Sequence, residues 1–287
     1  MEIIRGYRDN KALRDSFNAL AEQTFGGLNF EGWYQNGFWG DNYDPHSIVL
    51  DGRVVANVSV NRCDMEIGGQ RSRILQLGTV MTDPAYRGRG LSRAIMDSIE
   101  PELAAADGVY LFGNDSVVDF YPKFGFRRGR EMEYRKSVHQ TKPATAEQVV
   151  MDSPAAWARL SAAMERSTFR EGCKMVGNPE LIFFYVSQFM QESVFYIPRL
   201  DAWAVAELED GTLTIYNIFA GETVTVNDII AAFGPEVHTV ALAFAPESPE
   251  GWSVSDLHEE DCNFFVRGGV FDEFEARELR IPSLSHA

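Results

Sequence analysis

The sequence predicts a two-domain α/β (α+β) protein, in which a mixed, mainly antiparallel sheet is flanked by helices. Segments with helical spacing alternate with β-branched runs in both halves of the 287-residue chain. Gly-containing hairpin signals separate consecutive strands of the first half, which favours antiparallel neighbours. A stretch with two prolines and few large apolar residues separates the halves. The length fits two domains of ordinary size.

The first half starts with a predicted strand near residues 3–7 and a helix over residues 9–27. Leu13, Phe17 and Leu20 recur on one face of that helix, as core-facing residues do. A second short helix is expected around residues 30–38. These segments place two helices before the main run of strands.

Residues 47–82 contain β-branched runs that are broken at Asp51-Gly52 and Gly68-Gly69, so we expect three antiparallel strands in a row. The next segment, residues 90–107, carries one apolar helical stripe, and Pro101 inside it should kink or shorten the helix. Three further segments complete the half: a buried strand at 108–114, a short helix running into a turn at 115–126, and a final strand at 131–138.

The predicted domains are residues 1–137 and 154–287, with a linker at 138–153. The second half has helical segments and strand-like runs in an order that repeats the order of the first half. Its helices are expected at 154–167, 178–190 and 226–234, and its strands at 202–208, 212–220, 239–245 and 263–269.

The chain is acidic, with 42 Asp and Glu against 26 Lys and Arg, a formal charge of −16. This balance opposes binding to nucleic acid or to a membrane surface, because phosphate recognition depends on cationic side chains. The N-terminus lacks the pattern of a signal peptide, and no apolar run is long enough to cross a membrane, so we predict a cytoplasmic protein. Cys63, Cys173 and Cys262 are widely spaced, which predicts buried free thiols and no metal site.

The turn at residues 87–90 has the features of an anion-binding site. In "VMTDPAYRGRGLSRAIM", residues 80–96, a strand is followed by Gly88-x-Gly90 and a helix. Helix N-termini expose unpaired N–H groups and a partial positive charge, so they bind phosphates. Glycine allows close approach to the main chain, and Arg87 and Arg89 add forked donors. The turn matches neither the dinucleotide-binding nor the Walker pattern.

These residues resemble the GCN5-related N-acetyltransferase (GNAT) superfamily. The resemblance rests on "P-x-Y-R-G-x-G-L" within residues 80–96, and on Asn114 lying seven residues before Tyr121, which precedes a K-x-G-F turn. One departure is Ala85, which stands where the family signature has Gln or Arg. The resemblance covers residues 1–137 and implies a GNAT-like fold. The second half is similar in element order to a degenerate copy, but residues 225–234 lack the glycine turn with arginines.

The resemblance implies acetyl-CoA as co-substrate and assigns its contacts. Main-chain groups of Val80, Met81 and Thr82 would pair with the pantetheine arm. Amides of Gly88, Arg89, Gly90, Leu91 and Ser92 would hold the pyrophosphate, with the Arg87 and Arg89 side chains near the phosphates. Asn114 would touch the cofactor where two strands diverge, and Phe120 would pack on the pantetheine arm.

In the resemblance, Tyr121 matches the position at which relatives carry a general acid. A tyrosine suits this role, because its phenol stays protonated at neutral pH and can protonate the leaving thiolate. The general base stays open. Glu31, Asp41, Asp44 and Asp115 lie in segments that border the acceptor site in relatives, and His46 is a further candidate.

The sequence therefore predicts an N-acetyltransferase that transfers an acetyl group to a primary amine by direct attack in a ternary complex, with a small cationic acceptor favoured. Two alternatives stay open: a CoA-binding sensor or scaffold without turnover, and a protein N-acetyltransferase. A homodimer also stays open.

Overall fold

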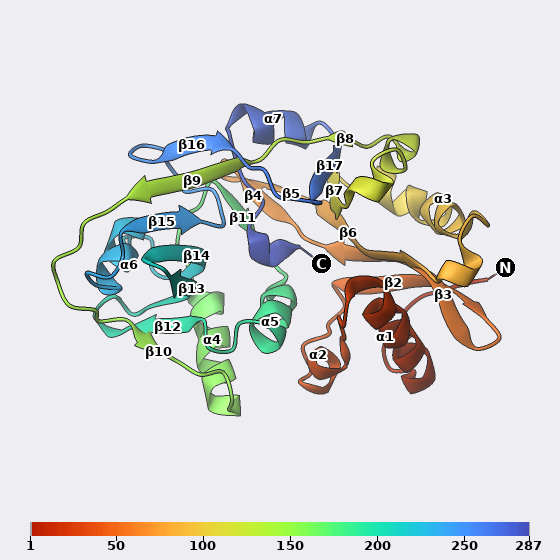
Figure 1. Ribbon diagram of the computed structural model, residues 1–287, viewed down its shortest axis with the longest axis horizontal. Coiled ribbons are helices and arrows are strands. Elements are labelled where there is room, and N and C mark those ends of the chain that lie inside the picture. The colour runs from red at the N-terminus through yellow and green to blue at the C-terminus, as the bar shows by residue number, and fades with distance from the viewer. Residues whose placement is uncertain (1, 287) are drawn as a thin grey trace.

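Two seven-stranded sheets organise residues 2–286, the part of the chain that the computed structural model describes (Figure 1). Neighbouring strands of the first sheet are antiparallel, except for the parallel pair β6 and β7. In spatial order this sheet consists of β1 (Ile3–Ile4), β2 (Tyr43–Leu50), β3 (Arg53–Arg62), β6 (Ile74–Thr82), β7 (Gly108–Gly113), β17 (Asn263–Arg267) and β8 (Arg127–Arg128).

The second sheet repeats this arrangement, with one parallel pair, β14 and β15, between antiparallel neighbours. Its order is β10 (Glu147–Gln148), β12 (Val194–Ile197), β13 (Ala202–Glu209), β14 (Thr212–Phe219), β15 (Thr239–Leu242), β9 (Met132–Ser137) and β16 (Ser253–Asp256). The predicted mixed, mainly antiparallel α/β fold is therefore confirmed, and the second half is consistent with a duplicated copy of it.

The sheets exchange one strand each. β17, from the C-terminal half, is the sixth strand of the first sheet, and β9, from the N-terminal half, is the sixth strand of the second. The division at residues 138–153 therefore does not follow sheet membership. Within that predicted linker, β10 pairs with β12 as an edge strand. The sequence shows that 131–138 is a strand, but only the fold selects the sheet it joins.

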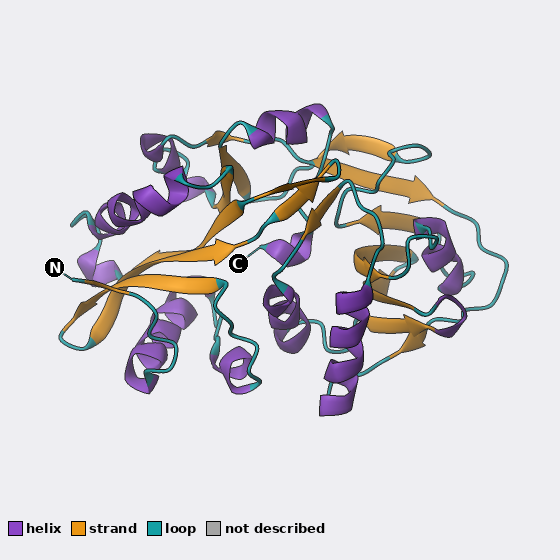
Figure 2. Ribbon diagram, turned by 180° about the vertical axis from the view of Figure 1, so that it is seen from behind, coloured by secondary structure: helices purple, strands orange, loops and turns teal. Residues whose placement is uncertain are grey.

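Helices cover both sheets, as the two views of the ribbon show (Figures 1 and 2). In the first half, α1 and α2 lie on one face of the first sheet and α3 on the other. The helices are α1 (Lys11–Phe25), α2 (Glu31–Gln35), α3 (Leu91–Ala104), α4 (Pro154–Arg166), α5 (Pro179–Gln188), α6 (Val226–Ala232) and α7 (Val270–Ala276).

Two local predictions need correction. The Gly68-Gly69 hairpin joins β4 (Met65–Ile67) to β5 (Gln70–Ser72), which form a separate small sheet with β11 (Cys173–Met175) from the other half. The prediction for Pro101 agrees with the structure, since α3 ends at Ala104, three residues after the proline and before the end of the predicted segment 90–107. The segment 115–126 forms two short 3₁₀ turns, at Asp115–Val117 and Tyr121–Phe124, instead of a helix.

An aromatic core joins the two halves. The Phe30 and Phe184 rings stack with centroids 5.2 Å apart, and Trp33 meets Phe184 edge-on at 5.5 Å. The indole N–H of Trp33 donates to the Glu180 carbonyl at 2.9 Å. Phe30 and Trp33 are each at most 3% exposed. Burial on this scale fixes α5 against α2.

In the second sheet, the parallel pair β14 and β15 corresponds to β6 and β7 of the first sheet. Residues 280–283, near the C-terminus, lie against the end of β15. Beyond the β14 and β15 register, the Ser283 N–H donates to the Ala243 carbonyl at 2.9 Å, and Arg280 Nη1 donates to the Leu242 carbonyl at 2.9 Å. The chain itself therefore occupies that position in the second copy. No helix within residues 2–286 is long and apolar enough to span a membrane.

Candidate functional site

A cavity of about 460 Å³ opens where β6 and β7 diverge. The two strands pair only from Ile74 to Leu77 on β6, and beyond Leu77 each continues without the other. The main-chain groups beyond that point lose their ladder partners and line the cavity. The lining comes from α1, β6, the glycine turn, β7 and the 3₁₀ turns: Thr24, Phe25, Leu77, Gly78, Thr79, Val80, Met81, Thr82, Arg87, Ser92, Phe112, Gly113, Asn114, Ser116, Val117, Phe120 and Tyr121.

The cavity continues toward the glycine turn. A second hollow, of about 300 Å³, shares Thr82, Arg87, Ser92 and Phe120 with it and reaches Gly88 and Gly90. Together the two form a trough that ends at the N-terminus of α3. Since α3 has 14 residues, its first turn presents unpaired amides and the positive end of a full helix dipole.

Gly90 caps α3 in the left-handed region, at φ +75°, and Gly88 lies at φ +74°. Apart from the residues next to each glycine in the chain, no described residue comes within 4 Å of the position of a Cβ atom at Gly88 or Gly90. The turn needs glycine for its backbone conformation, and the space over it is open. An anion could reach the main chain here without displacing a side chain.

Arg87 and Arg89 brace this turn. Arg87 Nε donates to the Thr82 carbonyl at 3.2 Å, and Arg89 Nη2 donates to the Ala85 carbonyl at 3.1 Å. Both side chains are exposed. Thr82 and Ser92 share a hydroxyl hydrogen bond of 2.8 Å, which ties the end of β6 to the start of α3. The arginines thus have a structural role in the turn in addition to their charge.

Tyr121 lies at the inner end of the trough and is 3% exposed. Burial raises the pKa of its phenol to about 12, so the group is protonated over the physiological range. A Cβ on Gly113 would lie 2.9 Å from Tyr121 Cε2, so the ring has this place only because residue 113 is glycine. A protonated phenol beside the cavity can serve as a proton donor.

The other predicted cofactor residues also border the trough, with different roles for their side chains. Phe120 lines both hollows, half-buried beside the Tyr121 ring. The Asn114 carboxamide accepts hydrogen bonds from the Ser116 N–H and hydroxyl, so it caps the first 3₁₀ turn. Met81 and Leu91 are buried, and each lines one of the two hollows.

A bulge in β6 is a feature that the sequence did not indicate. Asn57 pairs with Met81, but Ser59 pairs with Gly78, so Thr79 and Val80 have no partner in the described register. Thr79 has φ +43°, rare for a β-branched residue. Both residues line the cavity. Main-chain N–H groups that face such a cavity can stabilise developing negative charge on an oxygen held beside them.

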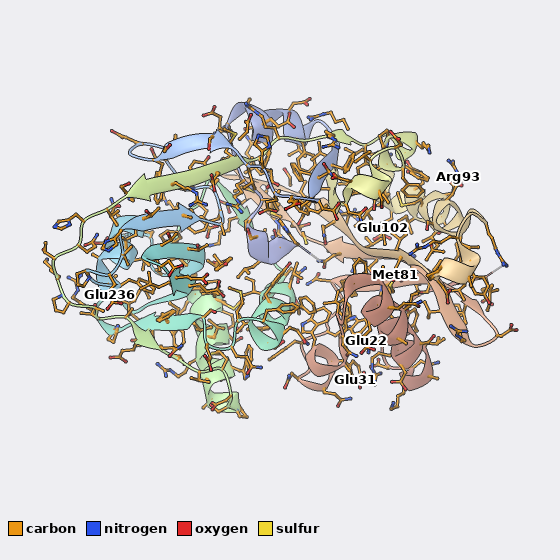
Figure 3. All side chains as sticks on the ribbon, in the orientation of Figure 1. Glu22, Glu31, Met81, Arg93, Glu102 and Glu236 are labelled. Carbon is orange, nitrogen blue, oxygen red and sulfur yellow. The ribbon has the colours of Figure 1, made fainter. Side chains whose placement is uncertain are left out.

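None of the five candidates for the general base lines the cavity. Arg14 donates two hydrogen bonds to Glu31 and lowers its pKa to about 2, and Figure 3 shows Glu31 on α2, apart from Met81 on β6. Asp41 pairs with Arg8, and Asp44 accepts the Gly6 N–H. His46 is buried beside Asp44 on β2, where burial lowers its pKa.

Asp115, the remaining candidate, accepts a hydrogen bond from Asn263 Nδ2 at 2.9 Å. Asn263 also donates to the Gly113 carbonyl at 3.1 Å. The Tyr121 ring packs on Phe265 with centroids 5.3 Å apart. Two residues of β17, from the far end of the sequence, therefore hold the wall of the cavity. No local signal could have identified them, because their role depends on the strand exchange.

A smaller cavity of about 230 Å³ lies on the other side of Phe112. Glu131 lines it and is 6% exposed. One of its oxygens accepts the Ile281 N–H at 2.8 Å. Burial raises the pKa of Glu131 from 4.5 to about 7. This carboxyl is therefore partly protonated at neutral pH.

We expect Glu131→Gln to remove a pH-dependent loss of stability. The pKa of Glu131 is higher in the folded than in the unfolded protein, so its protonated carboxyl stabilises the fold. This contribution to the free energy of unfolding is complete below pH 4.5 and is lost as the pH rises through 7, by up to about 3 kcal/mol. In urea unfolding from pH 4.5 to 8, the free energy of unfolding of the variant should rise relative to that of the wild type by this amount. Glu147→Gln, on the exposed edge strand β10, is the control. Parallel pH profiles for wild type and Glu131→Gln would refute the shift.

Comparison with known proteins agrees with this geometry. Residues 10–129 match the acetyltransferase (GNAT) domain family. A conserved protein from Enterococcus faecalis V583 has the same fold, with 13% identity and a TM-score of 0.62 over 96% of this chain and 74% of that one. A GCN5-related N-acetyltransferase from Kribbella flavida is 18% identical, with a TM-score of 0.56 over 93% of this chain and 71% of that one. Another from Anabaena variabilis is 12% identical, with a TM-score of 0.54 over 93% of this chain and 72% of that one. At these identities the likeness establishes the fold.

Proposed function

Residues 10–129 form a GNAT acetyltransferase domain, and from that premise we propose that the chain is an acetyl-CoA-dependent N-acetyltransferase. It transfers the acetyl group to a primary amine by direct attack in a ternary complex. The observation that carries the proposal is the trough between the diverging strands and the N-terminus of α3, open over Gly88 and Gly90.

The trough has the chemistry that acetyl-CoA requires. The pyrophosphate would lie on the amides of residues 88–92, and the pantetheine arm would run past Phe120 along Val80 to Thr82. The thioester would then lie at the diverging strands, between the β6 bulge and Tyr121. These placements use the site residues predicted from the sequence. They leave the acceptor amine on the Phe25 and Thr79 side of the cavity.

Tyr121 would protonate the thiolate of CoA as the thioester breaks. The acceptor amine forms the new C–N bond and loses its proton to solvent or to a base yet to be identified. The acidic chain favours a small cationic amine as the acceptor, since a negative field concentrates cations.

The test follows thiol release from acetyl-CoA with a panel of primary amines, in wild type and Tyr121→Phe. We expect turnover on at least one small cationic amine, and a fall in kcat of about 10-fold or more in the variant, the usual contribution of general acid catalysis. Tyr34→Phe is the matched control. The Tyr34 hydroxyl donates to Asp9 outside the cavity, so its removal should leave kcat unchanged.

Other outcomes separate the alternatives. Acetyl-CoA binding without turnover on any amine would support a sensor or scaffold. Turnover on peptide N-termini but on no small amine would support a protein N-acetyltransferase. Turnover that Tyr121→Phe leaves intact would remove Tyr121 as the acid.

A further inference from the structure

Six polar side chains form a continuous buried network on the first sheet, next to the β6 bulge. They come from the segment before α1 and from β2, β3 and β6, and none is more than 6% exposed. The members are Tyr7, Tyr43, Ser47, Asn57, Ser59 and Thr79. Buried polar groups destabilise a core unless they are hydrogen-bonded, so a connected network of this size calls for a functional explanation.

Asn57 is the hub of this network. Its Nδ2 donates to the Thr79 carbonyl and to the Ser59 hydroxyl, both at 2.9 Å. Its Oδ1 accepts a hydrogen bond from the Ser47 hydroxyl at 2.8 Å, and Tyr7 in turn contacts that hydroxyl at 2.7 Å. Three hydrogen bonds fix the orientation of the Asn57 amide group, and Asn57 is fully buried.

Thr79 is held from two sides. Asn57 binds its carbonyl, and its hydroxyl donates to Ser59 at 2.8 Å and is bonded to the Tyr43 phenol. A β-branched residue at φ +43° is strained, and such a conformation persists only where the surroundings determine it. The network therefore maintains the bulge, and the bulge takes Thr79 and Val80 out of the β3 register beside the cavity.

We infer that Asn57 is a positioning residue for acyl transfer: by binding the Thr79 carbonyl, it holds the β6 bulge in the geometry in which a main-chain N–H of Thr79 or Val80 meets the thioester carbonyl. The inference rests on the proposed function. Asn57 does not line the cavity, so it acts only through the main chain. An interaction with the developing oxyanion strengthens as the reaction proceeds, and its loss lowers kcat more than it raises KM.

The test compares Asn57→Ala with Asn61→Ala. Asn61 is a matched control, because it lies on the same strand, is 1% exposed, and its side chain is hydrogen-bonded to Asn178 and Gln76. We expect Asn57→Ala to lower kcat by about 10-fold or more, with the KM for acetyl-CoA changed by less than about 3-fold. Asn61→Ala should lose similar thermal stability and keep its kcat.

A second readout does not need turnover. Infrared spectroscopy of bound acetyl-CoA, isotope-labelled at the carbonyl carbon, reports hydrogen bonding to the thioester. Relative to acetyl-CoA free in solution, we expect the carbonyl stretch of the bound molecule to shift to lower frequency in wild type and in Asn61→Ala. We expect this shift to be lost in Asn57→Ala. If Asn57→Ala does not fold, Asn57→Ser and Ser59→Ala carry the same measurement.

The outcomes distinguish this inference from the proposed function. Failure of the wild type to bind acetyl-CoA would overturn the proposed function and the inference with it. Binding by wild type, with equal kcat and equal carbonyl stretch in the Asn57 and Asn61 variants, would overturn the inference alone. If no amine is turned over, the infrared shift alone tests the inference: an equal carbonyl stretch in the Asn57 and Asn61 variants overturns it.

Discussion

Gly90→Glu is expected to weaken acetyl-CoA binding by about 100-fold or more. The substitution places a carboxylate in the open space over the α3 N-terminus, where the pyrophosphate would lie. Bringing like charges together costs several kcal/mol, and each 1.4 kcal/mol is a factor of about ten in affinity. Calorimetric titration of acetyl-CoA into wild type and variant measures this loss.

Gly52→Glu is the matched control for backbone strain. Gly52 also lies at φ +75° with no described atom within 4 Å of its Cβ position, but it is in the hairpin between β2 and β3. Gly90→Ala separates strain from charge at the site itself. An affinity for acetyl-CoA that Gly90→Glu leaves within a few-fold of wild type would contradict the placement of the pyrophosphate.

The fragment of residues 1–153 is expected not to fold alone, although it contains every motif of the proposed acetyltransferase site. In the whole chain, β17 forms five residue pairs with β7, and the fragment would leave that edge of β7 open. Tyr121 would lose its packing on Phe265, and β9 would lose both of its neighbours in the second sheet. An open apolar edge strand also favours aggregation.

Circular dichroism and size-exclusion chromatography test this expectation. Co-expression of residues 1–153 with residues 154–287 supplies β17 in trans and should restore a folded complex. A monomeric fragment 1–153 that unfolds cooperatively on its own would show that the strand exchange is dispensable. It would also support the predicted division of the chain into independent domains.

The strength of the sequence evidence varied along the chain. Glycines with positive φ and the helix stripe of residues 91–103 are local properties, so the turn and α3 could be predicted from the sequence. The helix predicted within residues 115–126 is replaced by two 3₁₀ turns, the second of which ends at Gly125 in the left-handed region. The surroundings of the base candidates could not be predicted from local patterns: Arg14, 17 residues before Glu31 in the chain, forms an ion pair with it.

By itself, the sequence determined the fold class and the glycine turn before α3, because these depend on periodicity, backbone freedom and short motifs. The resemblance of those motifs to a known family also pointed to many of the residues that line the trough. Only the tertiary structure decided that β17 pairs with β7 in the first sheet, that Asn263 and Phe265 contact the residues of the cavity wall, and that Asn57 binds the Thr79 carbonyl. Pairing between distant strands and hydrogen bonds within a buried network depend on which segments meet in space. A linear pattern does not contain that information.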